Sequence, residues 1–163
     1  MGDFAQKISK VDKKELLSIL HCAFAEEWLA YYQYWTGAKI AEGLERPKVE
    51  AEFKEHAAEE LKHADWLADR IIQLGETPIL DPKDWAMYAK CKYEVPDNVD
   101  TKVLVAQNLA AERCAIERYQ EICNMTENKD YETFRIARKI LKEELEHEQE
   151  MEDFETDFKY YNK

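Results

Sequence analysis

One pattern of glutamate and histidine residues occurs twice in this chain, once in each half. The interval between the first and second glutamate is 33 residues in one half and 32 in the other, and a histidine follows the second glutamate three residues later in both. The repeated residues are Glu27, Glu60 and His63 in the first half, and Glu112, Glu144 and His147 in the second. Such a repeat indicates two copies of one supersecondary unit that pack against each other.

The composition favours long helices over sheet. Only four Gly and four Pro interrupt the 163 residues, while good helix formers are abundant. This length suits one domain with a proper core. We therefore expect an all-α protein with a single domain over residues 1–163.

Apolar residues recur at helical spacing in four long segments. The expected helices run from Asp12 to about Glu42, from about Pro47 to Gly75, from about Asp100 to Met125, and from the end of a turn at 126–130 to about Phe158. Residues 76–99 carry three of the four prolines, which predicts a crossover with one short helix from Lys83 to about Lys90. The expected topology is a four-helix bundle of two antiparallel hairpins joined by one long crossover.

The repeated glutamates and histidines all fall on the apolar stripes of their helices. On a helix, residues i and i+3 lie about 60° apart around the axis, so each Glu-x-x-His pair presents two ligands to one point. An unpaired buried carboxylate is costly, and four of them need about four positive charges, which two divalent metal ions supply. Taken singly, each residue is better explained as a solvated glutamate or a satisfied core histidine. The joint pattern predicts a dinuclear metal site.

A tyrosine follows each first glutamate at an interval of seven residues. These residues are Tyr34 and Tyr119. They are candidates to hydrogen-bond the ligand carboxylates, although packing in the core accounts for them equally well.

The segments that carry the candidate ligands resemble those of bacterioferritins. They are Ala25-Glu26-Glu27 leading to Gln33-Tyr34, Glu59-Glu60-Leu61-Lys62-His63-Ala64-Asp65, and Glu143-Glu144-Leu145-Glu146-His147. The resemblance covers almost the whole chain and implies a ferritin-like fold with a di-iron site. It also implies that Glu60 and Glu144 bridge the two irons, that Glu27 and His63 complete one iron, and that Glu112 and His147 complete the other.

Two departures narrow the resemblance. Leu61 stands where bacterioferritins carry the haem-ligating methionine, so no haem is expected. Only 16 residues follow His147, too few for a fifth C-terminal helix. These features, with the crossover insert and Cys91, resemble the Dps-like miniferritins called thioferritins. That resemblance implies a hollow cage of twelve subunits and a redox-active cysteine pair near the metals. We expect Cys91 and Cys114 to form the pair, although each is equally well explained as a small buried apolar residue.

The resemblance implies that the protein is a ferroxidase that stores iron and protects against oxidative stress. It would oxidise Fe(II) with hydrogen peroxide or oxygen at two iron ions per subunit, and manganese or zinc would also suit the ligands. A rubrerythrin-like peroxidase, a di-manganese catalase or another small di-metal oxidase, and a DNA-compacting cage are the alternatives. The net charge of −12 disfavours DNA as a partner. No apolar run is long enough for a signal or a membrane span, and we expect a cytoplasmic protein.

Overall fold

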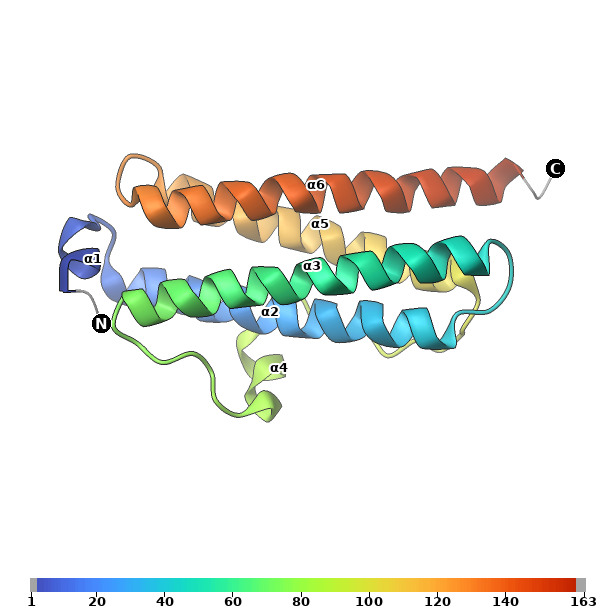
Figure 1. Ribbon diagram of the computed structural model, residues 1–163, viewed down its shortest axis with the longest axis horizontal. Coiled ribbons are helices and arrows are strands. Elements are labelled where there is room, and N and C mark those ends of the chain that lie inside the picture. Colours follow the sequence, from blue (N-terminus) through green and yellow to red (C-terminus); the bar gives the residue numbers. More distant parts are fainter. Residues whose placement is uncertain (1–2, 161–163) are drawn as a thin grey trace.

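The computed structural model describes residues 3–160 and consists of two antiparallel helical hairpins packed side by side (Figure 1). The first hairpin pairs α2 (Lys13–Ile40) with α3 (Arg46–Gln73), and the second pairs α5 (Thr101–Thr126) with α6 (Tyr131–Tyr160). The predicted all-α bundle with one long crossover is confirmed. The four long helices begin and end within a few residues of the predicted bounds.

The ends of the first two long helices follow from their capping residues. Asp12 precedes α2, and its carboxylate accepts a hydrogen bond of 3.0 Å from the backbone N–H of Glu15. Gly75 follows α3 with φ +80°, which a glycine adopts at little cost. Its N–H bonds to the carbonyl of Ile72, and that of Glu76 to the carbonyl of Ile71. This pair of bonds is a Schellman motif, which ends α3 where the sequence places its glycine.

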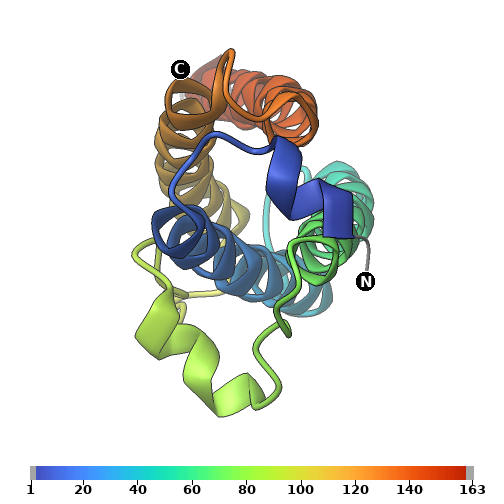
Figure 2. The same ribbon diagram turned by 90° about the vertical axis from the view of Figure 1, so that its left-hand side faces the viewer.

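The crossover carries two short helical pieces, the 3₁₀ turn η1 (Pro82–Asp84) and α4 (Trp85–Tyr88). They end two residues before the predicted limit of Lys90. Both lie outside the bundle, beside the first hairpin (Figures 1 and 2). The ring of Trp85 stacks on that of Trp28 in α2, with a centroid distance of 5.1 Å. This contact holds the crossover against α2.

A short N-terminal helix, α1 (Asp3–Ile8), was not predicted. The segment is too short for a periodic apolar pattern, so its sequence carries little signal. It lies near the turn between α5 and α6, where the N–H of Lys10 donates to the carbonyl of Lys129 at 2.9 Å. Tertiary contacts place this segment beside the turn.

The core divides into two apolar clusters along the bundle. One contains residues 16–24, 64–74, 119–123 and 136–140 of the four long helices. The other contains residues 34–41, 49–57, 104–109 and 151–158. The repeated glutamates and histidines lie between these ranges on every helix. A buried polar layer therefore separates the two halves of an apolar core.

The described residues 3–160 contain neither a fifth long helix nor a membrane-spanning one. No helix follows α6 within them, in agreement with the prediction of no fifth helix. None of their helices is both long and apolar enough to cross a membrane.

A buried ion pair joins the two hairpins at the end of α3. The Arg70 guanidinium, 2% exposed, donates to both carboxylate oxygens of Asp130 at 2.9 and 2.8 Å. It also donates to the hydroxyl of Thr133 at 2.8 Å, and Asp130 accepts from the Thr133 N–H at the start of α6. Contacts with Thr133 and Arg70 hold the pKa of Asp130 below its usual value, although burial alone would raise it.

Removing the anion from this pair should destabilise the fold strongly. Asp130→Ala leaves the Arg70 charge buried and unpaired, a change that typically costs about 3–5 kcal/mol. Thermal unfolding at one fixed protein concentration should show a clear fall in Tm. The matched control is Glu132→Ala, which removes an exposed ion pair with Arg135 one turn away and should cost at most about 1 kcal/mol. Equal effects of the two substitutions would contradict this assignment.

Candidate metal centre

The structure brings all six repeated residues together in the middle of the bundle. Their side chains are between 0% and 3% exposed. They form two overlapping groups in which the potential ligand atoms all lie within 4.8 Å of one another. The groups are Glu27, Glu60, His63 and Glu144, and Glu60, Glu112, Glu144 and His147. Each group could hold one metal ion, and Glu60 of α3 and Glu144 of α6 belong to both groups.

Glu60 and Glu144 each reach both histidines. Glu60 places one oxygen 2.9 Å from Nδ1 of His63 and the other 3.3 Å from Nδ1 of His147. Glu144 does the same, at 3.2 and 3.5 Å. Glu27 lies near His63 alone, at 3.3 Å, and Glu112 near His147 alone, at 3.8 Å. These proximities are compatible with the ligand sets that the sequence resemblance implies, with Glu60 and Glu144 common to both groups.

The outer nitrogen of each histidine is held by a glutamate from the opposite hairpin. Nε2 of His63 lies 2.8 Å from Glu143, and Nε2 of His147 lies 2.8 Å from Glu59. A proton on each Nε2 would leave the Nδ1 lone pair facing the centre, which is the tautomer that a metal ligand needs. Neither glutamate was predicted to have a role. The signal was present, because each stands directly before a repeated glutamate in a Glu-Glu-Leu-x-His segment.

The two tyrosines cross between the hairpins. Tyr34 of α2 donates its hydroxyl hydrogen bond to Glu112 of α5, and Tyr119 of α5 donates to Glu27 of α2. Both tyrosines are 1% exposed. Each first glutamate is therefore positioned by the hairpin to which it does not belong.

The six groups perturb one another strongly. Burial raises the pKa of Glu27 and Glu112 well above the usual value. Burial acts the same way on Glu60 and Glu144, but the nearby imidazoles of the two histidines bring the pKa of both carboxyl groups below the usual value. Burial alone would lower the pKa of both histidines, yet the surrounding carboxylates raise it above the usual value. Without a metal, the protein must use protons to balance its buried carboxylates.

Several buried polar atoms in the centre lack a hydrogen-bond partner within the described chain. They are Oε1 of Glu60, both carboxylate oxygens of Glu144 and Nδ1 of His147. Buried polar atoms are rarely left unsatisfied unless they serve a ligand or an ion. Oxygen and imidazole donors of this kind suit divalent metals such as iron, manganese and zinc. The residues therefore fit a pair of metal ions.

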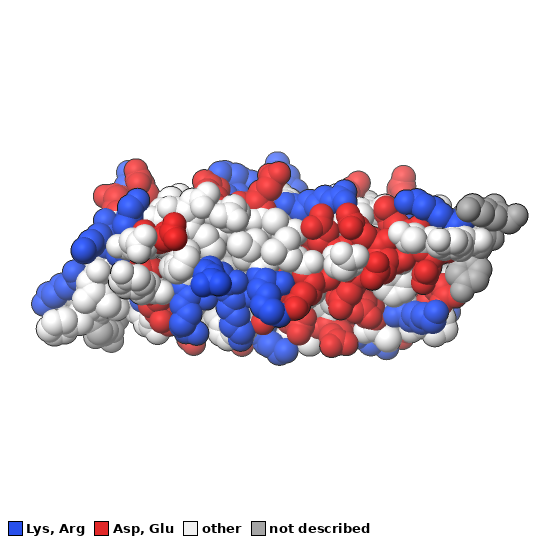
Figure 3. Space-filling model, turned by 90° about the horizontal axis from the view of Figure 1, so that it is seen from above, with Lys and Arg blue, Asp and Glu red and all other residues white. Residues whose placement is uncertain are grey.

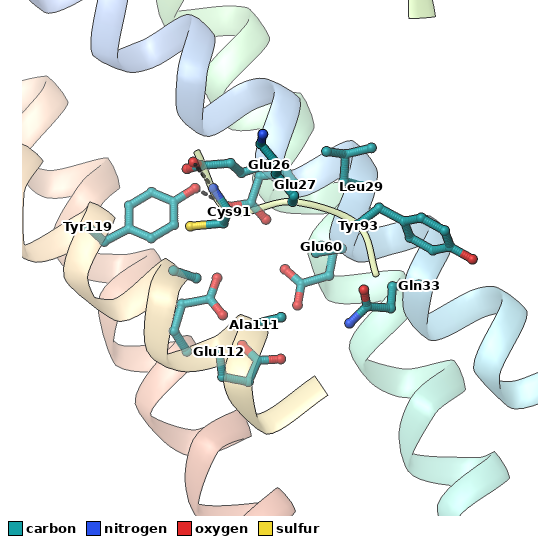
Figure 4. A pocket seen from close by; sticks show the side chains of 14 residues that line it. Glu26, Glu27, Leu29, Gln33, Glu60, Cys91, Tyr93, Ala111, Glu112 and Tyr119 are labelled. Carbon is teal, nitrogen blue, oxygen red and sulfur yellow. Dashed lines mark hydrogen bonds between the residues drawn. The ribbon is translucent and has the colours of Figure 1, made fainter. Parts of the chain in front are cut away.

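A small cavity of about 30 Å³ opens from the centre towards the crossover. Figure 4 shows the carboxylates of Glu27, Glu60 and Glu112 beside it, with Cys91 and Tyr93 on the segment that covers it. Cys91 is joined to Cys114 of α5 by a disulfide, with Cα atoms 5.8 Å apart. Cys22 and Cys123 are free and buried. The disulfide attaches the covering segment to α5.

Glu26 holds the same segment from the side of α2. Its carboxylate accepts hydrogen bonds of 2.9 Å from the backbone N–H groups of Lys90 and Cys91. The guanidinium of Arg118 supplies the countercharge at 3.0 Å, and both side chains are buried. Sequence reasoning missed this pair because its partners are 92 residues apart. The pair fixes the covering segment over the cavity.

Comparisons with known proteins agree with this architecture. A family model described as Ferritin, a ferritin-like domain, matches residues 17–160. The chain is 35% identical over 147 residues to a "DNA protection during starvation protein" of Pyrococcus furiosus, which covers 90% of this chain and 80% of that protein.

Two solved structures show the same fold. A dodecameric thioferritin, the bacterioferritin-related protein of Bacteroides fragilis, superposes with a TM-score of 0.97 at 51% identity, covering 99% of this chain and 97% of that chain. Dps from Thermosynechococcus elongatus superposes with a TM-score of 0.83 at 19% identity, covering 93% and 94%. The sequence resemblance to Dps-like thioferritins is confirmed, and the chain belongs to the ferritin-like domain family.

Proposed function

We propose that this protein is a ferroxidase that stores and detoxifies iron in the cytoplasm. It oxidises Fe(II) with hydrogen peroxide or oxygen at a dinuclear iron centre within each subunit, and deposits the ferric product inside a hollow homo-oligomeric cage. The ligands are Glu27, Glu60, His63, Glu112, Glu144 and His147.

One observation carries the proposal: two buried ligand groups share Glu60 and Glu144. Shared carboxylates hold two ions close together, so that one oxidant can take an electron from each of them. The ligands that belong to only one group come from different hairpins. Glu27 and His63 come from the first hairpin, and Glu112 and His147 come from the second. The centre thus assembles only where the two hairpins meet.

Two Fe(II) ions are the substrate of each reaction cycle. Each Fe(II) gives one electron, and hydrogen peroxide takes both electrons and two protons to become two waters. With oxygen as the oxidant, the same two electrons and two protons yield hydrogen peroxide. Bound iron supplies the redox chemistry. Glu59 and Glu143 hold the histidine rings, the tyrosines hold Glu27 and Glu112, and the buried setting limits access of water.

The cage rests on the similarity to the dodecameric thioferritin and on exposed apolar side chains. Leu80, Met87 and Val95 of the crossover are 83%, 72% and 75% exposed. Large apolar side chains exposed along one segment are typical of surfaces that meet another protein. We infer that copies of this chain cover them.

A rubrerythrin-like peroxidase or a di-manganese catalase could use the same ligand set. A catalase would convert peroxide to oxygen and water without net oxidation of added Fe(II). Following Fe(II) consumption and oxygen release in the same reaction therefore separates a catalase from a ferroxidase.

Loss of a shared ligand should abolish rapid oxidation. In Glu144→Ala both metal positions lose a carboxylate, and the initial rate of Fe(II) oxidation, followed by absorbance of the ferric product, should fall by roughly 100-fold or more. The assembly should stay intact, because the substitution also removes a costly buried charge. The control is Glu146→Ala on the exposed face of α6, which should oxidise at the unaltered rate. An unchanged rate in Glu144→Ala would rule out the dinuclear centre.

Neutralising the glutamate behind a histidine should weaken metal binding without unfolding the protein. Glu143→Gln keeps the size of the side chain but removes the carboxylate that holds Nε2 of His63. Affinity for Zn(II), measured by competition with a coloured chelator, should fall about 10- to 100-fold. Glu146→Gln is the matched neutral substitution and should bind normally. If Glu143→Gln retains full affinity, this glutamate does not position the ligand.

The native mass should correspond to about twelve chains of 19.3 kDa. Light scattering coupled to size-exclusion chromatography measures this directly. A stable dimer at micromolar concentration would contradict the cage and favour a small di-metal enzyme.

A further inference from the structure

The surroundings of the two metal positions are not alike, although the ligands repeat. Counting equal intervals from the repeated residues gives three pairs of equivalent positions on α3 and α6. The pairs are Glu52 with Ile136, His56 with Ile140, and Glu150 with Trp66. Beside His63 the three positions hold the apolar residues Trp66, Ile136 and Ile140, which pack in the apolar cluster that includes residues 64–74. Beside His147 they are polar. Neither the bundle nor the dinuclear centre requires this polarity, because the other half manages without it.

The three polar side chains converge on one point between α3 and α6. Nε2 of His56 lies 2.8 Å from a carboxylate oxygen of Glu150 and 3.6 Å from one of Glu52. A ligand atom from each of the three residues lies within 4.8 Å of the others. The side chain of His56 is 1% exposed, while those of Glu52 and Glu150 are 29% and 46% exposed. The group therefore runs from a buried nitrogen to solvent.

The imidazole of His56 is not satisfied by the described chain in either neutral tautomer. Its Nδ1 is buried and has no hydrogen-bond partner there. With the proton on Nε2, the Nδ1 lone pair is a buried acceptor without a donor. With the proton on Nδ1, the Nε2 lone pair faces two carboxylates, which repel it. A cation bound by Nε2 and the carboxylates removes that repulsion.

The same histidine also borders the buried centre. Its ring stacks on that of His147, with centroids 3.9 Å apart. One of its nitrogens lies within 4.8 Å of potential ligand atoms of Glu112 and His147. On the face of the molecule that carries α6, acidic side chains gather over the half that holds the C-terminal part of this helix (Figure 3). A cation bound by Glu52, His56 and Glu150 would lie between this acidic surface and the metal position beside His147.

We propose that Glu52, His56 and Glu150 form a third divalent cation site, separate from the dinuclear centre. One nitrogen and two carboxylate ligands suit transition metals such as Fe(II), Co(II) and Zn(II), and the exposed side leaves room for water ligands. That Fe(II) is the ion bound in the cell rests on the proposed function. The site itself requires only the side chains described above.

Anomalous diffraction from crystals of the metal-free assembly soaked in dilute Zn(II) tests the proposal. The unaltered protein should show three peaks per subunit, two in the buried centre and one at His56. In the Glu52→Gln Glu150→Gln variant, which keeps the size of both side chains, the third peak should disappear while the buried pair remains. Asp157→Asn, which removes an exposed carboxylate of α6 outside the group, is the control and should keep all three.

Equilibrium dialysis against Co(II) checks the result in solution. Binding should fall from about three to about two ions per subunit in the double variant. Absence of a peak at His56 in the unaltered protein, or its persistence in the double variant, would overturn the third site. Absence of the buried pair would instead count against the proposed function and leave a peak at His56 as evidence for the third site.

Discussion

The burial of four carboxylates at the middle of the bundle is the constraint on which the rest of the structure depends. Each would be destabilising alone, since a charge removed from water must be paired or neutralised. The two apolar clusters on either side supply the folding energy and hold the four helices at the separation that the polar layer requires. Stability thus comes from the ends of the bundle, and chemistry from its middle.

The partners of the polar layer come mainly from across the interface between hairpins. Glu143 and Glu59 hold the histidines of the opposite hairpin, and Tyr34 and Tyr119 hold the opposite glutamates. Arg70 and Asp130 add a buried ion pair between the same two units. Misalignment of the hairpins by one helical turn would break all of these contacts together. The polar layer therefore fixes the register of the bundle, which apolar contacts alone specify poorly.

The sequence predicted the helices and the six central residues because both depend on periodicity along one helix. A carboxylate on an apolar stripe, such as Glu27 or Glu112, is conspicuous without any tertiary knowledge. Contacts between distant segments were harder to predict. The pair Glu26–Arg118 and the bond from His147 to Glu59 depend on which helix faces which, and Glu26 and Glu59 adjoin the repeated glutamates without standing out from them. His56 was missed because it has no counterpart in the repeat, on which the ligand prediction rests.

The crossed tyrosines make contacts that two identical, unlinked hairpins could also make. A hairpin whose tyrosine reaches the glutamate of a second identical hairpin would make both contacts in a symmetric dimer, where every substitution appears twice. Linking the two hairpins through the crossover removes that obligation. One half can then keep Ile140 while the other acquires His56, and the shared centre is preserved. The covalent link between the hairpins thus allows the surroundings of the two ligand groups to differ within one symmetric frame.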